Sequence, residues 1–459
     1  MFDTIAAIST AVGEAGIGIV RLSGKDAIKI ANNIFRGINN KTLLDAENRK
    51  MVYGHIIDNR NDEIIDEVLI VSMKEPHTYT RENVVEIYCH GGIIPVRKIL
   101  ELLLYNGARL AEPGEFTKRA FLNGRLDLSQ AEAVIDIIKA KTDKSFQVSM
   151  DQLEGGLSKK VEVIRDTVLS MLAHVEVTID FPEDDIEEVT YEELEENANR
   201  VISEIKKLLS TADRGKILRD GINTVILGKP NVGKSSLMNA LLRENRAIVT
   251  DIPGTTRDII EEHLNIDGIP LRIIDTAGIR ETEDLVERIG VDRAKETIES
   301  ADLIIAVFDI STDLTEEDYN IIDLIKGRKA LVLLNKTDLP KKYSEDRLRE
   351  LLEGVDIISA SVINEVGLDV LEDSIKEMFY SGEIELDSSV VVTNLRHKNQ
   401  LEKALVNMES ALNDIRAQVP LDCIEVDLRD CWENLGEILG ETIGEDILDK
   451  IFAEFCIGK

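Results

Sequence analysis

The stretch NTVILGKPNVGKSSLMNALL, residues 223–242, decides the fold of the middle of this chain. Its first five residues form an apolar run typical of a buried strand, and residues 237–242 carry helix-forming side chains. Between them, Gly228–Ser235 fits the pattern G-x-x-x-x-G-K-[ST]. The glycines let the loop curl so that its N–H groups face phosphates, and the next helix adds its N-terminal dipole. The stretch therefore predicts a phosphate-binding loop between a strand and a helix.

The motifs that follow this loop assign roles around a nucleotide. Lys234 should bridge the β- and γ-phosphates, and Ser235 should ligate Mg²⁺. After the apolar run 271–274, Asp275-Thr276-Ala277-Gly278 fits the pattern D-x-x-G, which places Asp275 near the Mg²⁺ shell and the Gly278 amide near the γ-phosphate. Alone, Asp275 would read as an ordinary strand-end aspartate; the order of the motifs favours the nucleotide role.

The base is predicted to be guanine. Asn335-Lys336-Thr337-Asp338 follows the strand-like run 331–334, and Asp338 can accept hydrogen bonds from N1–H and the exocyclic amine of guanine. Adenine does not offer this pair of donors, so Asp338 selects guanine. Ser359-Ala360-Ser361 suits a backbone contact to guanine O6. The ordered motifs thus predict binding and hydrolysis of GTP.

A switch loop should lie between the first two motifs, at Thr250–Asp258 (TDIPGTTRD). We expect Thr256 to reach Mg²⁺ and the γ-phosphate; a surface loop with incidental threonines is the alternative. Ile279 follows the D-x-x-G motif where Ras-type enzymes use glutamine to orient water. Isoleucine cannot orient water, so hydrolysis is either slow or served by other groups. The predicted GTP-binding residues are Asn231, Val232, Gly233, Lys234, Ser235, Ser236, Thr250, Asp251, Ile252, Pro253, Gly254, Thr255, Thr256, Asp275, Thr276, Ala277, Gly278, Asn335, Lys336, Asp338, Ser359 and Ala360.

Around this segment the texture of the sequence changes. Residues 1–120 mix β-rich runs with a helical stretch, which favours an α+β domain. Residues 121–220 and 381–459 have long helical periodicity, whereas residues 221–380 alternate strand and helix as in a parallel sheet. We therefore expect a multidomain α/β and α protein, in which a Ras-like P-loop α/β domain is inserted into a helical domain built from both flanks.

Composition constrains the partners and the compartment. The 459 residues carry a formal net charge of −33, which disfavours unaided binding of tRNA or DNA unless a basic patch or partner compensates. The four cysteines are scattered, so neither a disulfide framework nor a zinc site is expected. We see no signal peptide and no apolar run long enough for a membrane span, and expect a cytoplasmic protein with no membrane association.

Several stretches resemble the MnmE (TrmE) family of tRNA-modification GTPases. These are the P-loop with Ser236, the switch Gly254–Asp258, the terminal Phe455–Lys459 and two N-terminal stretches, residues 18–24 (GIVRLSG, from Gly18 to Gly24) and 113–124. The likeness covers essentially the whole chain. The GTPase motifs are shared with assembly-type GTPases, whereas the Cys456-Ile457-Gly458-Lys459 tail and the N-terminal stretches are more specific to this family.

The resemblance implies a potassium-activated GTPase. Asn231 would help to hold K⁺ beside the phosphates, with Thr250, Ile252 and Thr255 completing the shell, and Mg²⁺ would be held by Ser235 and Thr256. K⁺ would then take the part of an arginine finger. The water-orienting glutamate of the family falls on Glu287, which by itself reads as an exposed helix acid. The catalytic residues expected are Glu287, Asn231 and Lys234.

The resemblance also implies that the N-terminal α+β domain binds a tetrahydrofolate. The cofactor would be a 5-formyl- or 5,10-methylene-tetrahydrofolate, and the matching positions are Arg21, Glu86, Arg125 and Lys459. Arginine and lysine suit pterin oxygens and glutamyl carboxylates, and glutamate suits the N–H edge of the pterin. The family can carry lysine at position 125, so contact geometry there can differ. Without the family, Arg21 and Glu86 read as surface ion-pair residues on strands.

The function implied is modification of carbon 5 of the wobble uridine (position 34) of certain tRNAs to carboxymethylaminomethyl- or aminomethyluridine. The chain would be a homodimer and would form a heterotetramer with the flavin-dependent partner MnmG, with tRNA as the substrate of the complex. The main alternative is an assembly or signalling GTPase without one-carbon chemistry, which would need neither the folate site nor the tail. A scaffold with a vestigial GTPase domain is a third interpretation, against which Lys234, Ser235, Asp275 and Asp338 all stand.

Overall fold

The computed structural model describes residues 3–38, 41–180, 190–245, 261–274, 298–379 and 390–459. The chain folds into two compact units. The first comprises residues 1–135, 152–197 and 410–459, and the second comprises residues 136–151 and 198–409. Both are therefore discontinuous in sequence. The predicted domain boundaries at 120, 220 and 380 stay predictions.

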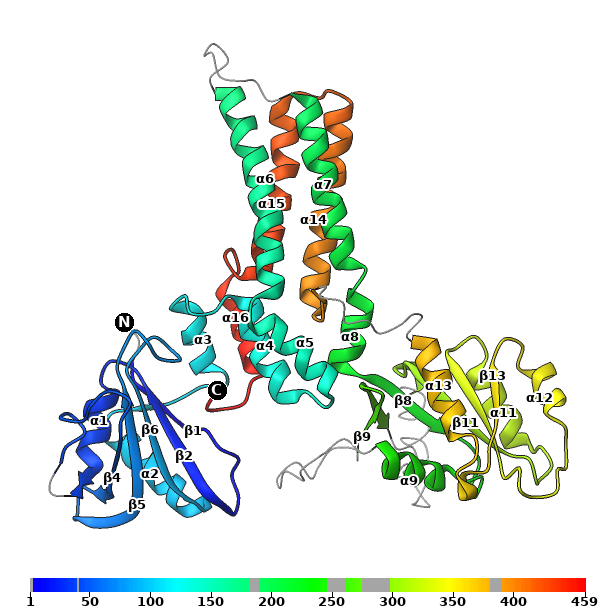
Figure 1. Ribbon diagram of the computed structural model, residues 1–459, viewed down its shortest axis with the longest axis horizontal. Helices are drawn as coiled ribbons and strands as arrows, with labels where there is room; N and C mark the ends of the chain where they lie inside the picture. The colour runs from blue at the N-terminus through cyan, green and yellow to red at the C-terminus, as the bar shows by residue number, and fades with distance from the viewer. Residues whose placement is uncertain (1–2, 39–40, 181–189, 246–260, 275–297, 380–389) are drawn as a thin grey trace, which may run out of the picture. The chain divides into compact units, whose positions relative to one another are not determined.

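An antiparallel-rich sheet forms the N-terminal half of the first unit (Figure 1). In the described residues its strand order is β3-β4-β5-β6-β2-β1-β7. Val20, Leu22, Ile70, Val85 and Ile87 alternate along neighbouring strands toward one buried face, where α1 and α2 cover them. The strands are β1 Ile5–Ile8, β2 Ala15–Ser23, β3 Phe35–Gly37, β4 Met51–Asp58, β5 Glu63–Met73, β6 Val84–Gly91 and β7 Arg109–Leu110, and the helices are α1 Ala27–Ile34 and α2 Ile93–Tyr105.

Helices complete the first unit. The long helix α6 packs along α15, so segments far apart in sequence share one apolar seam (Figure 1). Glu195 of α7 pairs with Arg416 of α14 at 2.8 Å within this unit. The flanks of the GTPase segment thus pack together, as predicted. The helices are α3 Glu115–Leu122, α4 Leu128–Lys139, α6 Gly156–Asp180, α7 Tyr191–Leu209, α14 Leu395–Arg416, α15 Leu421–Leu439 and α16 Glu445–Ala453, of which α4, α7 and α14 continue into the second unit.

The second unit is built on a sheet of order β13-β12-β11-β8-β10-β9. All described pairings are parallel except that of β9 with β10. Its central strands are buried on both faces and therefore read as continuous apolar runs. The elements are α5 Asp143–Leu153, α8 Ala212–Asp220, β8 Ile222–Leu227, α9 Lys234–Asn245, β9 Glu261–Ile266, β10 Ile269–Ile274, β11 Leu303–Asp309, α11 Glu316–Ile325, β12 Ala330–Asn335, α12 Glu345–Leu351, β13 Asp356–Ser359, η3 Val362–Asn364 and α13 Leu368–Phe379.

This topology places the predicted nucleotide motifs at one edge. Because β8, β11, β12 and β13 are parallel, their carboxyl ends meet at the same edge of the sheet. Ligands bind at this edge in open α/β sheets. Gly228, Asp309, Asn335 and Ser359 lie at or directly after these strand ends. The expected fold class, a multidomain α/β and α protein with a P-loop domain, is confirmed. In the described residues, no helix combines the length and apolarity that a membrane crossing requires.

Candidate GTP site and N-terminal ligand site

The phosphate-binding loop joins β8 to α9. Asn231 and Gly233 have φ angles of 63° and 108°, so the backbone passes through the left-handed region at two positions. The Lys234 Nζ donates to the carbonyl oxygens of Gly228 and Lys229, at 2.7 and 2.9 Å. The ammonium therefore lies inside the curl of the loop, where the β- and γ-phosphates are expected.

Two glycines of this loop have no room for a side chain. A Cβ at Gly233 would lie 2.3 Å from the Asn335 Nδ2, and one at Gly228 would lie 2.7 Å from the Val307 carbonyl oxygen. Both distances are well inside van der Waals contact. Packing against β11 and β12 thus disfavours a side chain at both glycines, and the positive φ of Gly233 adds a backbone requirement at that position.

The motif at the end of β12 holds the phosphate-binding loop in place. The Asn335 Nδ2 donates to the Val232 carbonyl at 2.8 Å, and its Oδ1 accepts from the Val362 N–H at 3.0 Å. The Lys336 Nζ donates to the Asn231 carbonyl at 2.8 Å. Asn335 and Lys336 therefore connect their own loop with the phosphate-binding loop and with the segment at Val362. The sequence motifs predict the order of these loops along the chain but not these contacts.

Asp309, at the end of β11, supports this arrangement, and the sequence motifs did not single it out. Its carboxylate pairs with the Lys336 Nζ at 2.7 Å. Although burial raises the pKa of Asp309, its bonds with Lys336 and Ser311 outweigh burial and lower the pKa. The sequence signal that could have identified Asp309 is its position as an aspartate at the end of a strand-like apolar run. The charged Asp309 keeps Lys336 directed at the phosphate-binding loop.

Asp338 is already oriented at the predicted base site. The Ser361 hydroxyl donates to its Oδ1 at 2.6 Å, while the Thr337 N–H donates to the Ala360 carbonyl at 3.1 Å. Asp338 is exposed, so the carboxylate is accessible to a ligand. The structure thus brings the NKTD motif together with the segment Ser359–Ser361.

Part of the predicted site lies outside the described residues. The predicted residues concerned are Thr250, Asp251, Ile252, Pro253, Gly254, Thr255, Thr256, Asp275, Thr276, Ala277, Gly278, Ile279 and Glu287. Ser235 and Ser236 are described and are exposed in the first turn of α9.

A second group of predicted residues meets on the N-terminal sheet. Arg21 of β2 lies opposite Glu86 of β6 in register, and their side chains form an ion pair at 2.8 Å. The alternative interpretation, in which Arg21 and Glu86 are ordinary ion-pair residues on strands, also predicts this ion pair. The Tyr88 hydroxyl donates to the second oxygen of Glu86 at 2.7 Å. Arg21 also lies 5.7 Å from the centre of the Phe116 ring.

The C-terminal tail reaches the same place. An Arg21 N–H donates to the Gly458 carbonyl at 3.4 Å, and the Ser9 hydroxyl donates to that carbonyl at 3.2 Å. The Lys459 carbonyl accepts from the Phe116 N–H at 3.2 Å. The chain end thus lies beside Arg21, although more than four hundred residues separate the two in sequence.

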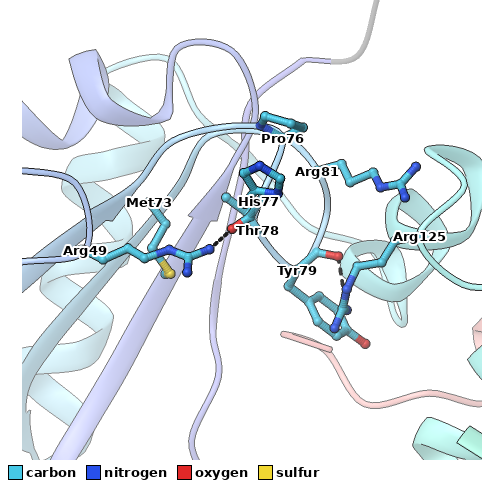
Figure 2. A pocket seen from close by; sticks show the side chains of 8 residues that line it. All are labelled: Arg49, Met73, Pro76, His77, Thr78, Tyr79, Arg81 and Arg125. Atoms are coloured by element: carbon cyan, nitrogen blue, oxygen red, sulfur yellow. Dashed lines mark hydrogen bonds between the residues drawn. The ribbon is translucent and has the colours of Figure 1, made fainter. Parts of the chain in front are cut away.

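Arg125 belongs to this neighbourhood through Tyr79, which the sequence motifs missed. Its guanidinium lies 4.6 Å from the centre of the Tyr79 ring and donates to the Tyr79 carbonyl at 3.3 Å (Figure 2). Burial raises the pKa of Tyr79, while its hydrogen bond with Thr117 and the charges of Arg125 and Arg21 lower it in part. An aromatic residue beside two arginines is suited to stack on a flat ligand ring. No sequence signal distinguished Tyr79 from a core tyrosine.

The fold and the first of these sites define a class. A mostly parallel sheet in which an interior strand enters a G-x-x-x-x-G-K-S loop, clamped by an Asn-Lys-x-Asp strand end, is typical of the domain of P-loop GTPases.

Comparison with known proteins then gives the family. The family models described as "GTP-binding protein TrmE N-terminus" and "MnmE helical domain" match residues 4–125 and 128–456. The tRNA modification GTPase MnmE of Alkaliphilus oremlandii (strain OhILAs) is 59% identical over 457 residues, 100% of this chain and 99% of the relative. That of Bacillus subtilis (strain 168) is 53% identical over 458 residues, 100% of both chains. This chain therefore belongs to the MnmE family of tRNA modification GTPases.

Among solved structures, the G domain of the T. maritima FeoB iron transporter is 27% identical, with a TM-score of 0.27; the match covers 34% of this chain and 97% of that one.

Proposed function

We propose that this chain is a K⁺-activated GTPase that modifies carbon 5 of the wobble uridine of certain tRNAs together with a flavoprotein partner, MnmG. A one-carbon tetrahydrofolate bound to the N-terminal domain supplies the carbon, and GTP hydrolysis drives rearrangement of the domains. The protein acts as a homodimer within a heterotetramer. The observation that carries the proposal is that one chain holds both a P-loop clamped by Asn335 and Lys336 and an Arg21–Glu86 pair in contact with the Gly458 carbonyl.

The described part of the GTP site fits its proposed cations. Mg²⁺ prefers oxygen ligands, and the exposed Ser235 hydroxyl at the start of α9 supplies one, with Thr256 proposed as the second. The Asn231 carbonyl accepts a hydrogen bond from Lys336, but the Asn231 side chain is exposed and can reach a ligand. We propose that this side chain binds K⁺ together with Thr250, Ile252 and Thr255. K⁺ would neutralise charge that develops on the phosphates. Lys234 would bind the same phosphates, and Glu287 would orient water.

The N-terminal site suits a folate. Glu86 can accept from the N–H edge of a pterin, and Arg21, Arg125 and Lys459 can donate to its oxygens or to glutamyl carboxylates. An assembly or signalling GTPase without one-carbon chemistry gives no reason for the chain end to lie against Arg21. We therefore favour the folate-dependent function over that alternative.

The cation mechanism is tested by exchanging KCl for NaCl at constant ionic strength. GTP hydrolysis by the full chain should slow at least about tenfold in NaCl, because K⁺ contributes charge stabilisation of the kind that costs roughly 10²–10³-fold when one donor is removed. Asn231→Ala should abolish the difference between the salts. Equal rates in the two salts for the unmodified chain would contradict the mechanism.

The tRNA function is tested in cells by mass spectrometry of wobble nucleosides. Deletion of the gene should remove the 5-aminomethyl-type uridines, and the intact gene should restore them. An Arg21→Ala gene should fail to restore them although the protein still hydrolyses GTP. Full modification in the deletion strain would favour the assembly or signalling alternative.

A further inference from the structure

A cavity of about 640 Å³ is lined in part by Arg125, one of the proposed folate residues. Its volume falls within the range of about 300–1,000 Å³ that small-molecule sites occupy. The side chains that line it include three arginines and a histidine, shown in Figure 2: Arg49, Met73, Pro76, His77, Thr78, Tyr79, Arg81 and Arg125. Arg125 and Tyr79 therefore belong to the cavity as well as to the neighbourhood of Arg21.

The three arginines have no carboxylate partner among the described residues. Arg49 donates to the His77 carbonyl, Arg81 donates to the Asn123 carbonyl at 2.8 Å, and Arg125 donates to the Tyr79 carbonyl. A carbonyl fixes a guanidinium in place but does not neutralise its charge. Other arginines of the same domain, such as Arg36 and Arg97, pair with Asp62 and Glu101. In a chain with a net charge of −33, three uncompensated cations around one cavity indicate an anionic ligand.

Backbone conformation points to the same two side chains. Arg49 and Arg81 have φ angles of 63° and 58°, in the left-handed region that disfavours long side chains. Glycine or asparagine would adopt this conformation at lower cost. Such strain concentrates at ligand-binding sites, where the side chain has a use that offsets it. Both strained arginines line the cavity.

We propose that this cavity binds the γ-linked glutamate chain of a polyglutamylated folate. The inference rests on the proposed folate site: the pterin would lie at Arg21 and Glu86, and the glutamates would extend past Tyr79 and Arg125 to Arg81 and Arg49. Each added γ-glutamate brings one more carboxylate, and the planar guanidinium matches a carboxylate with two parallel donors. RNA phosphates are the weaker alternative, because the rest of this acidic chain repels a long polyanion whereas a short chain needs only the cavity.

The test compares 5-formyltetrahydrofolate carrying one glutamate with the form carrying five, by calorimetry on the full chain. The longer form should bind the unmodified chain about tenfold more tightly, which corresponds to about 1.4 kcal/mol. The double variant Arg49→Asn/Arg81→Asn should lose this gain and keep its affinity for the monoglutamate form, because asparagine suits the left-handed backbone. Arg36→Ala is the matched control: it removes an exposed, ion-paired arginine of the same domain and should keep the gain.

The outcomes separate this inference from the folate function on which it rests. Equal affinity of the two forms for the unmodified chain, or a gain that survives in the double variant, would overturn the inference and leave the folate site standing. Failure of both forms to bind the unmodified chain would overturn the folate function as well. A short single-stranded RNA whose binding depends on Arg49 and Arg81, with no gain from polyglutamate, would assign the cavity to phosphates and overturn the proposal.

Discussion

At the scale of single residues, Ser361 and Asp338 show how the proposed guanine contact would be prepared. The hydroxyl of Ser361 holds one carboxylate oxygen of Asp338, so the side chain does not have to order when the nucleotide arrives. The motif alone predicts Asp338 as the base-selecting residue, and this role stays a prediction. It could not predict the bond from Ser361, because hydroxyl direction depends on how η3 follows β13.

Replacing Asp338 should change base specificity. Asp338→Asn exchanges one acceptor for a donor, so it loses a hydrogen bond to guanine and gains one to the 2-oxo group of xanthine. We expect GTP affinity to fall at least about tenfold and XTP affinity to rise, since a mispaired polar group costs about 1–3 kcal/mol. Fluorescent GTP and XTP analogues measure both. Unchanged preference for GTP would show that Asp338 does not contact the base.

Asp3 gives a residue-scale prediction about pH. Its hydrogen bonds with Arg109 at 2.6 Å and Arg119 at 2.9 Å, opposed in part by burial, lower the pKa of Asp3 to about 2. The pKa of Asp3 in the folded chain lies below its value in the unfolded chain, so its ion pairs with Arg109 and Arg119 stabilise the fold above about pH 4. This contribution is lost as the pH falls toward about 2.

The matching experiment is a melting series on Asp3→Asn. The side chain is half exposed, so solvent screens the pair and the effect is small. The variant should melt about 1–3 °C below the unmodified chain at about pH 6, and the gap should narrow as the pH is lowered through about 3. Glu14→Gln, at an exposed position of the same unit, controls for loss of a carboxylate. A gap that widens on acidification would contradict the assignment.

At the scale of elements, α8 shows what periodicity can and cannot predict. The strand-like runs 18–22, 67–71 and 84–88 fall within β2, β5 and β6, because alternation of buried side chains is a local property. The contact between α8 and residues 391–392 is not local. Gly215 faces the Val392 backbone so closely that a Cβ there would lie 2.0 Å from its carbonyl oxygen. Nothing in the sequence near Gly215 signals this approach.

Gly215→Ala should therefore destabilise the second unit. In an exposed helix the change would stabilise by about 0.5–1 kcal/mol, but here the methyl group must displace backbone. We expect a net loss of about 1–3 kcal/mol in the free energy of unfolding, as for other overpacked sites. Urea unfolding followed by circular dichroism measures it, and Lys216→Ala, at the exposed next position, is the control. Stabilisation by Gly215→Ala would refute the close contact.

The same scale explains why domain boundaries are hard to place from sequence. Val148 of α5 is buried in the apolar core of the GTP-binding unit together with Leu218 and Ile269. A boundary drawn where strand and helix begin to alternate, at residue 221, leaves Val148 and Leu218 outside. The periodicity of the sequence indicates local secondary structure only, whereas the core of this unit includes side chains from a helix earlier in the chain.

At the scale of the whole molecule, charge bears on how tRNA is held. The net charge of −33 repels a polyanion at long range, while counterion release rewards proteins that bring cations to phosphates. The three arginines that lack a carboxylate partner in the described N-terminal domain gather around the proposed polyglutamate cavity, which has room for a small ligand. Phosphate contacts in the proposed complex should therefore come mainly from the partner.

The salt dependence of tRNA binding tests this division of charge. Each phosphate contact adds about −0.9 to the slope of log K against log salt concentration for a duplex. The isolated chain should bind tRNA weakly and with a shallow slope, and the complex with the flavoprotein tightly and with a steep one. Arg49→Asn/Arg81→Asn should leave the slope of the complex unchanged, whereas loss of one unit or more would place those arginines on the RNA. Tight, steeply salt-dependent binding by this chain alone would mean that a local basic surface outweighs its net charge.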